Sequence, residues 1–149
     1  MKRRRVVSAV ILSWFCLGLM NAPVSAQKIA KPQFVIIGHA GVSETLTHDE
    51  IKQIFLGRMT RKNGNSLGFI ILKDKTVYAA FLKASVGKTI AQYTNYWKKQ
   101  VFTGKGRMPK MFDDPADAQA YVAETEGAIS FLPSTLDVDD AVHTITITE

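Results

Sequence analysis

LTHDEIKQIFLGRMTRKNGNSLGFIILK, residues 46–73, carries the clearest structural signals in this sequence. It opens with a helix start, because Thr47 can cap the backbone N–H of Glu50 while Glu50 returns a bond to the N–H of Thr47. Leu46 is placed to pack on the first apolar residue of the helix. Apolar residues then recur at helical spacing, as Ile51, Ile54 and Phe55. We therefore predict an amphipathic helix that begins after Thr47.

The second half of this stretch predicts a turn and a strand. Gly57 ends the helix at a position that favours the left-handed conformation. The basic segment that follows contains Asn63-Gly64, a pair typical of a tight turn. Residues 69–72, FIIL, form a short apolar run, as in a strand covered on both faces. A helix that leads into a buried strand indicates an α/β protein, whose ligands sit beyond the carboxyl ends of the strands.

The remaining segments continue this alternation of helices and strands. We predict further strands at residues 34–37, 128–132 and 142–148, the last an edge strand with one wet face because VHTITIT alternates. Helices are predicted from 75 to about 85 after Asp74, from Thr89 to about 102, and from Asp114-Pro115 to 127. In the helix after Thr89, five residues are available for packing: Ile90, Tyr93, Trp97, Val101 and Phe102.

Residues 1–26 are expected to be a signal peptide. A positive start, Lys2 to Arg5, precedes an apolar run over 6–20 and a small-residue cleavage site, Val24-Ser25-Ala26. The alternative is an uncleaved anchor, but the apolar run is shorter than the roughly 20 residues of a spanning helix. We therefore expect a single domain at 27–149, periplasmic or secreted after cleavage near Ala26. This domain contains no cysteine.

The charge of residues 27–149 is small but unevenly distributed. Fifteen Lys and Arg stand against 13 Asp and Glu, a net charge of +2, which removes the main argument for a nucleic-acid partner. Residues 58–110 hold twelve basic residues and one acid, Asp74, whereas residues 113–149 hold nine acids and neither Lys nor Arg. This segregation permits an electropositive region that attracts a small anion. The loop 103–109, TGKGRMP, is further expected to form an anion nest from glycine N–H groups, Lys105 and Arg107.

Three segments together resemble a known family. They are Ile54–Arg58 (IFLGR), 97–109 (WKKQVFTGKGRMP) and 126–132 (EGAISFL). In this order they resemble small exported proteins similar to phosphate ABC transporter substrate-binding proteins. The resemblance covers about 35–132 and implies one lobe of a type II periplasmic binding protein. The implied fold class is α/β, a single three-layer lobe with a mixed, mostly parallel sheet of about four to five strands.

The resemblance also implies an anion site and a partner. In the family, a Ser-Gly-Thr-rich turn after the strand holds phosphate; the matching residues 72–76 here are shorter and lack the glycine and serine. The predicted ligands of inorganic phosphate or a similar small anion are Lys73, Lys75, Thr76, Ser43, Thr45, Arg58 and Arg61. The predicted function is an exported phosphate-binding or anion-binding protein associated with phosphate transport or sensing, without a cofactor. The alternative is a single-lobe interaction module without a ligand, which binds a membrane sensor or transporter.

Catalysis is not expected. The sequence has no Gly-x-Ser-x-Gly elbow, no His-Glu-x-x-His pair and no Walker loop. Asp113, Asp114 and Asp117 are better explained as a helix start than as acid–base groups. The three histidines are scattered without the spacing of metal ligands.

Overall fold

The computed structural model describes residues 33–149, and the predicted signal peptide lies outside this range. Residues 33–149 contain eight strands: β1 (Phe34–His39), β2 (Thr45–Thr47), β3 (Arg61–Lys62), β4 (Asn65–Ser66), β5 (Gly68–Leu72), β6 (Lys110–Phe112), β7 (Ala128–Pro133) and β8 (Val142–Thr148). The helices are α1 (His48–Phe55), α2 (Lys75–Phe81), the π-helical turn η1 (Leu82–Val86), α3 (Ile90–Phe102) and α4 (Pro115–Glu124). No helix within this described range is long and apolar enough to cross a bilayer.

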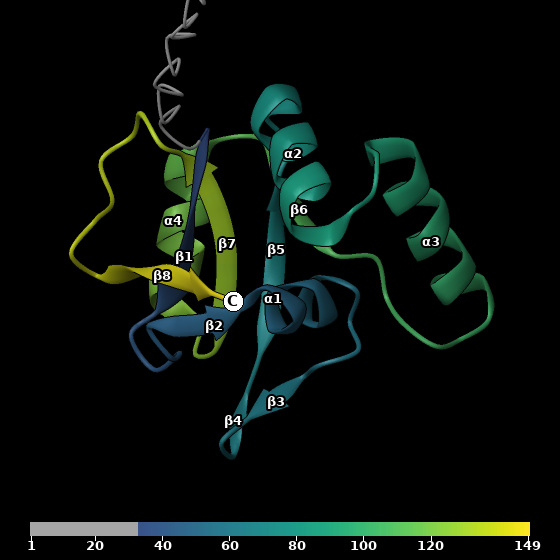
Figure 1. Ribbon diagram of the computed structural model, residues 1–149, viewed down its shortest axis with the longest axis horizontal. Coiled ribbons are helices and arrows are strands. Elements are labelled where there is room, and N and C mark those ends of the chain that lie inside the picture. The colour runs from purple at the N-terminus through teal and green to yellow at the C-terminus, as the bar shows by residue number, and fades with distance from the viewer. Residues whose placement is uncertain (1–32) are drawn as a thin grey trace, which may run out of the picture.

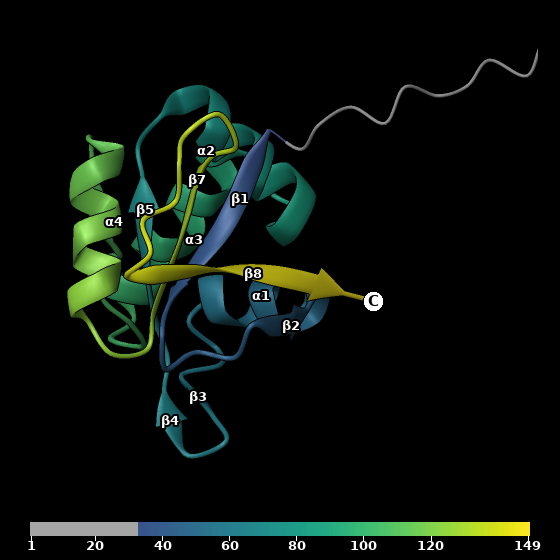
Figure 2. The ribbon, with the colours of Figure 1, turned by 90° about the vertical axis from the view of Figure 1, so that its left-hand side faces the viewer.

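The elements form three layers, as predicted. Figure 2 shows α4 on one side of the sheet and α1, α2 and α3 on the other. Six strands form the main sheet in the order β2-β8-β1-β7-β5-β6, while β3 and β4 form a separate hairpin (Figure 1). The sheet has more strands than the expected four to five, because two three-residue segments, β2 and β6, pair at its edges.

The sheet is mixed and mostly parallel. β5 runs parallel to both β6 and β7, and β2 runs parallel to β8, whereas β1 runs antiparallel to β7 and β8. β1 is therefore the one strand of this sheet that opposes the others. As a consequence, the loop that leaves the carboxyl end of β1 lies at the end of the sheet where β5 and β7 begin.

Residues 46–73 fold as the sequence predicts. Thr47 caps α1, and both bonds of the capping box are present: Glu50 N donates to Thr47 Oγ1 (3.2 Å) and Thr47 N donates to Glu50 Oε2 (2.9 Å). Gly57 has a φ of 67°, and the turn between β3 and β4 has positive φ at both Asn63 and Gly64. β5 follows with Ile70, Ile71 and Leu72 buried.

The helix starts after residue 73 are also confirmed. Asp74 caps α2, Thr89 caps α3 through a capping box with Gln92, and Asp114 caps α4 with Pro115 in its first turn. The helix predicted to about residue 85 changes its hydrogen bonding at Leu82 and continues as η1. Gly87, with a φ of 71°, ends it. The helix predicted to reach residue 127 ends earlier, at Glu124.

Aromatic rings fill the core between the sheet and the helices α1 and α2. Phe131 of β7 stacks on Phe81 with ring centroids 4.2 Å apart and on Tyr78 at 6.1 Å. Phe55 of α1 lies 4.5 Å from Phe81. These three phenylalanines are fully buried, so this cluster joins the outer helices to the central strands.

Two expectations about α3 and β8 are wrong. Val101 and Phe102 do not pack in the core: their exposed fractions are 43% and 93%, because α3 contacts the body through Tyr93 and Trp97 and its last turn extends beyond it. β8 is not an edge strand. Its first half pairs with β1, and its second half, residues 146–148, pairs with β2. The alternating pattern reports which side chains are buried and carries no information about what lies beside the backbone.

Candidate functional site

The predicted site at the carboxyl end of β5 brings Lys73, Lys75 and Thr76 together. Lys73 follows the last residue of the strand and donates its backbone N–H to Phe112 O at 2.8 Å, which holds it beside β6. Lys75 and Thr76 form the first turn of α2, and all three residues are exposed. The turn therefore presents two cations and one hydroxyl where ligands of parallel sheets commonly sit.

Two carboxylates oppose an anion at this place. Asp74 Oδ1 accepts the backbone N–H groups of Thr76 (3.0 Å) and Val77 (2.9 Å), so the helix cap itself occupies two of the N–H groups that would bind an anion. Lys73 Nζ lies 2.8 Å from Asp113 Oδ2. The side chains of that pair are 44% and 82% exposed, so the pair is weak and an anion can displace it.

Ser43 and Thr45 lie at the end of the sheet where β5 begins, opposite Lys73, which follows the end of β5. Ser43 is in the loop that leaves β1 and Thr45 is the first residue of β2, directly after that loop, and β1 runs antiparallel to β5. A strand rises about 3.3 Å per residue, so the length of β5, five residues, separates the two ends of the sheet by more than ~13 Å. A phosphate ion cannot contact both groups, and the single site containing all seven predicted residues is not formed.

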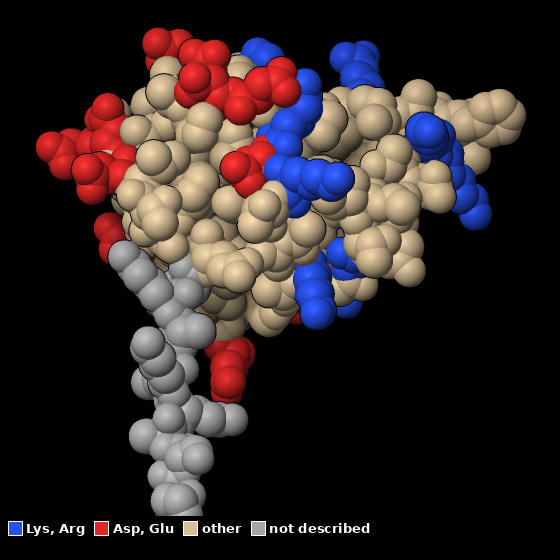
Figure 3. Space-filling model, turned by 90° about the horizontal axis from the view of Figure 1, so that it is seen from above, with Lys and Arg blue, Asp and Glu red and all other residues tan. Residues whose placement is uncertain are grey.

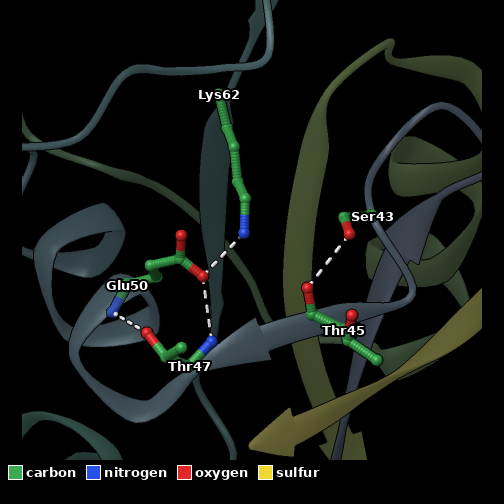
Figure 4. A network of polar contacts seen from close by, with 5 residues as sticks. All are labelled: Ser43, Thr45, Thr47, Glu50 and Lys62. Carbon is green, nitrogen blue, oxygen red and sulfur yellow. Dashed lines mark hydrogen bonds and ion pairs between the residues drawn. The ribbon is translucent and has the colours of Figure 1, made fainter.

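The end of the sheet near Ser43 has a hollow and a polar network of its own. Ser43 Oγ donates to the carbonyl of Thr45 at 3.0 Å (Figure 4). A hollow of about 250 Å³ lies between this loop and the β3–β4 hairpin, with Ser43, Leu46 and Lys62 in its lining. The one cation in this lining, Lys62, already binds Glu50, with Nζ and Oε2 2.7 Å apart. The hollow therefore has no free positive charge for an anion.

Glu50 joins the helix cap to the hairpin. Its Oε2 accepts both Lys62 Nζ and the N–H of Thr47 (Figure 4), and these two hydrogen bonds, that from Lys62 first, lower the pKa of the carboxyl below its usual 4.5. Because the folded-state pKa is lowered, the stabilisation is present above pH 4.5 and is lost as the pH falls through the folded pKa. Lys62 was predicted as part of a basic segment, and its pairing with Glu50 depends on the hairpin turn.

We expect Glu50→Gln to lower the free energy of unfolding at pH 7 by up to about 1 kcal/mol, because glutamine keeps the capping box and loses the ion pair. Denaturant unfolding at several pH values measures the difference from the unsubstituted protein, which should disappear below pH 4.5. Glu44→Gln, which removes an exposed carboxylate, is the matched control. A difference that stays constant with pH would contradict the role assigned to the ion pair.

Arg58 and Arg61 lie in two further places. Arg61 is in β3 and is exposed. Arg58 follows α1 and lines a hollow, here called the basic cleft, which is formed by residues 56–58, 60, 96, 97, 100 and 105–107. Arg58 shares this cleft with Lys105 and Arg107. The expected anion nest of glycine N–H groups is wrong for Gly104, whose N–H is used within the loop. The N–H of Gly104 donates to Val101 O and that of Lys105 to Gln100 O, because the loop turns back to close the end of α3.

Figure 3 shows the predicted charge segregation on the face seen from above. Lys and Arg gather over the side of α2 and α3, and Asp and Glu gather over the side of the loop before β8. Residues 33–149 contain no group of three or more His, Cys, Asp or Glu side chains arranged to hold a metal ion.

Known structures share this fold. The chain superposes on a phosphate ABC transporter substrate-binding protein with bound phosphate from Clostridium perfringens, with a TM-score of 0.57 and 19% identity over 77% of this chain and 44% of that one. This chain has the fold of one lobe of a phosphate substrate-binding protein. An ABC-type phosphate transport receptor from Vibrio cholerae matches with a TM-score of 0.50 and 15% identity, over 77% of this chain and 46% of that one.

The lobe spans less than half the length of either of these structures. No protein-family model matches its sequence, and no curated protein sequence matches it at a significant level. The likeness at this level of identity concerns the fold, so it supports the architecture inferred from residues 54–58 and 126–132.

Proposed function

We propose that this protein is an exported anion-binding protein of the substrate-binding type, with phosphate as its ligand. The observation that carries the proposal is the shared fold, because both matched structures are phosphate-transport proteins and one holds bound phosphate. The segregated charge supports the proposal, because the Lys and Arg side chains that gather over α2 and α3 attract anions electrostatically. Its partner is then a membrane transporter or sensor on the outer side of the membrane.

The proposed phosphate ligands are Lys73, Lys75 and Thr76. They are the predicted residues that lie together beyond the carboxyl end of β5. Binding requires that phosphate replace Asp113 as the partner of Lys73, which an exposed ion pair allows at small cost. Asp74 opposes binding by its charge, so the affinity depends on how far its carboxylate is screened.

Calorimetric titration of the protein with inorganic phosphate tests this proposal. We expect Lys73→Ala with Thr76→Ala to weaken binding by about tenfold or more, because each removes a hydrogen bond to a charged ligand. Lys83→Ala, which removes an exposed lysine from η1, should leave the affinity unchanged. Asp74→Asn keeps a good N-cap residue and removes the opposing charge, so it should strengthen binding.

The outcomes distinguish phosphate binding from two alternatives. Equal, weak responses to phosphate, sulfate and nitrate at fixed ionic strength would indicate diffuse charge screening and contradict the proposal. No response at millimolar phosphate, with Asp74→Asn equally silent, would favour the interaction module. A specific observation already points toward that second function: the cap carboxylate of Asp74 occupies the N–H groups at the start of α2.

A further inference from the structure

The basic cleft is a concave site near the start of β5, at the end of the sheet opposite Lys73. Its volume is about 460 Å³, within the range of about 300–1,000 Å³ of small-molecule sites. Trp97 is part of its lining, and the backbone comes close to this ring on two sides. A Cβ added at Gly57 would lie 2.7 Å from Trp97 Cη2, and one added at Gly106 would lie 3.1 Å from Cζ3. The two glycines thus let the two walls of the cleft close onto one indole ring.

Three cations line the cleft without a carboxylate partner. Arg58 comes from the end of α1, and Lys105 and Arg107 come from the loop after α3; all three are exposed. The ion pairs within residues 33–149 are Lys62–Glu50 and Lys73–Asp113, so none of the three cations takes part in one. The lining contains no Asp or Glu. Three positive charges therefore face one hollow from two separate parts of the chain.

Capping of the helix ends does not account for these cations. α1 and α3 both end at the cleft, but other groups satisfy their last carbonyls. Tyr93 Oη donates to Phe55 O at 2.6 Å and Tyr96 Oη donates to Leu56 O at 2.7 Å. The last turn of α3 is closed by the N–H groups of the loop itself. Each helix end contributes about half a negative charge, so three cations leave the cleft with a charge of about +2.

We propose that the basic cleft binds the phosphoryl group of a small phosphorylated organic molecule. Arg58 and Arg107 carry planar guanidinium groups that can each make two parallel hydrogen bonds to a phosphate, and Lys105 adds a point charge. The cleft is much larger than inorganic phosphate requires, and Leu56, Tyr96 and Trp97 line it beside the cations. Leu56 and Trp97 are only 4% and 5% exposed, so the half-buried ring of Tyr96 is the one of these three side chains that offers surface to the organic part of the ligand.

This site is separate from the proposed phosphate site. Trp97 lies against Phe69, near the start of β5, with ring centroids 5.7 Å apart, whereas Lys73 follows the end of that strand. The two sites therefore share no ligand residue, and each can fail without the other.

The test titrates the full protein, processed by its host, with glycerol 3-phosphate, inorganic phosphate and sulfate, using calorimetry and tryptophan emission. The sequence has two tryptophans, Trp14 and Trp97, so tryptophan emission reports on the cleft alone once residues 1–26 have been removed. If mass spectrometry shows that residues 1–26 are retained, a Trp14→Phe variant is used, in which Trp97 is the only tryptophan. We expect Arg58→Gln and Arg107→Gln each to weaken glycerol 3-phosphate binding by about 10- to 100-fold. Lys83→Gln, which also removes one positive charge at an exposed residue outside the lining, is the control and should have no effect.

The outcomes separate the two sites and the two sources of the phosphoryl group. Loss of ester binding with Arg58→Gln but not with Lys73→Ala supports the basic cleft, whether or not inorganic phosphate binds. Flotation with phosphatidylglycerol vesicles, against phosphatidylcholine vesicles, supports a lipid headgroup as the source if it depends on Arg58 and free ester does not bind. Absence of both free-ester and vesicle binding, or equal losses with Arg58→Gln and Lys83→Gln, would overturn the proposal.

Discussion

Replacing Gly127 with alanine is expected to lower the free energy of unfolding by about 3–5 kcal/mol. Gly127 has a φ of 75°, a conformation that costs a residue with a side chain about 1–2 kcal/mol. An added Cβ would also lie 2.0 Å from Ser66 O, a backbone atom that no side-chain rotation can move. The backbone cannot shift freely either, because Gly127 O accepts the N–H of Gly68 at 2.9 Å, next to the start of β5.

Gly87→Ala is the matched control for this prediction. Gly87 has a similar φ of 71°, but nothing lies within 4 Å of an added Cβ. Its substitution should therefore cost only the backbone term of about 1–2 kcal/mol. Denaturant unfolding of both variants, followed by circular dichroism, separates the collision with Ser66 from the conformational cost. Equal losses in the two variants would show that the β4–β5 segment moves aside easily, contrary to the geometry.

Replacing Phe131 with alanine is expected to lower the free energy of unfolding by about 3–5 kcal/mol. Its ring has no exposed surface and stacks between Phe81 at 4.2 Å and Tyr78 at 6.1 Å. The cavity left by the ring lies between β7 and α2, and the flanking rings of Tyr78 and Phe81, both on α2, cannot collapse into it without moving that helix. A loss of this size is a large part of the 5–15 kcal/mol that stabilises a typical domain.

Phe102→Ala provides the control for Phe131→Ala with the same change of side chain. Phe102 is 93% exposed, so its loss should change stability by less than about 0.5 kcal/mol. Thermal and denaturant unfolding of the two variants gives the comparison. A substantial loss with Phe102→Ala would mean that α3 buries this ring in solution, through another chain or another arrangement of the helix. A small loss with Phe131→Ala would mean that the aromatic cluster repacks.

The direction of β1 determines how the predicted anion ligands are distributed. A wholly parallel sheet would place the loop after β1 at the same edge as Lys73 and Thr76, and the sequence gives no sign of the reversal. Because β1 opposes its neighbours, Ser43 and Thr45 lie across the sheet from the lysines. Arg58 lies at a third location, the basic cleft, together with Lys105 and Arg107. The candidate site thus divides into pieces that sequence order alone cannot assign.

Two residues of the polar contacts were visible in the sequence, but their partners were not. Asp113 was explained as part of a helix start, and its ion pair with Lys73 forms because β6 lies beside β5. Lys62 was one of twelve basic residues, and its bond to Glu50 requires the hairpin to fold back over α1. Partners separated by 12 and 40 residues are set by the packing of elements and leave no local signal.

Local structure in this protein follows from local sequence. The caps at Thr47, Asp74, Thr89 and Asp114, the turn at Asn63-Gly64 and the buried strands at 69–72 and 128–132 depend on neighbouring residues and on hydrophobic spacing. Three features depend on the packing of distant elements: the pairing of β8 on both sides, the exposure of Phe102 and the convergence of three cations at the basic cleft. These features arise from contacts between residues far apart in the chain. Local hydrogen bonds and side-chain periodicity do not specify such contacts.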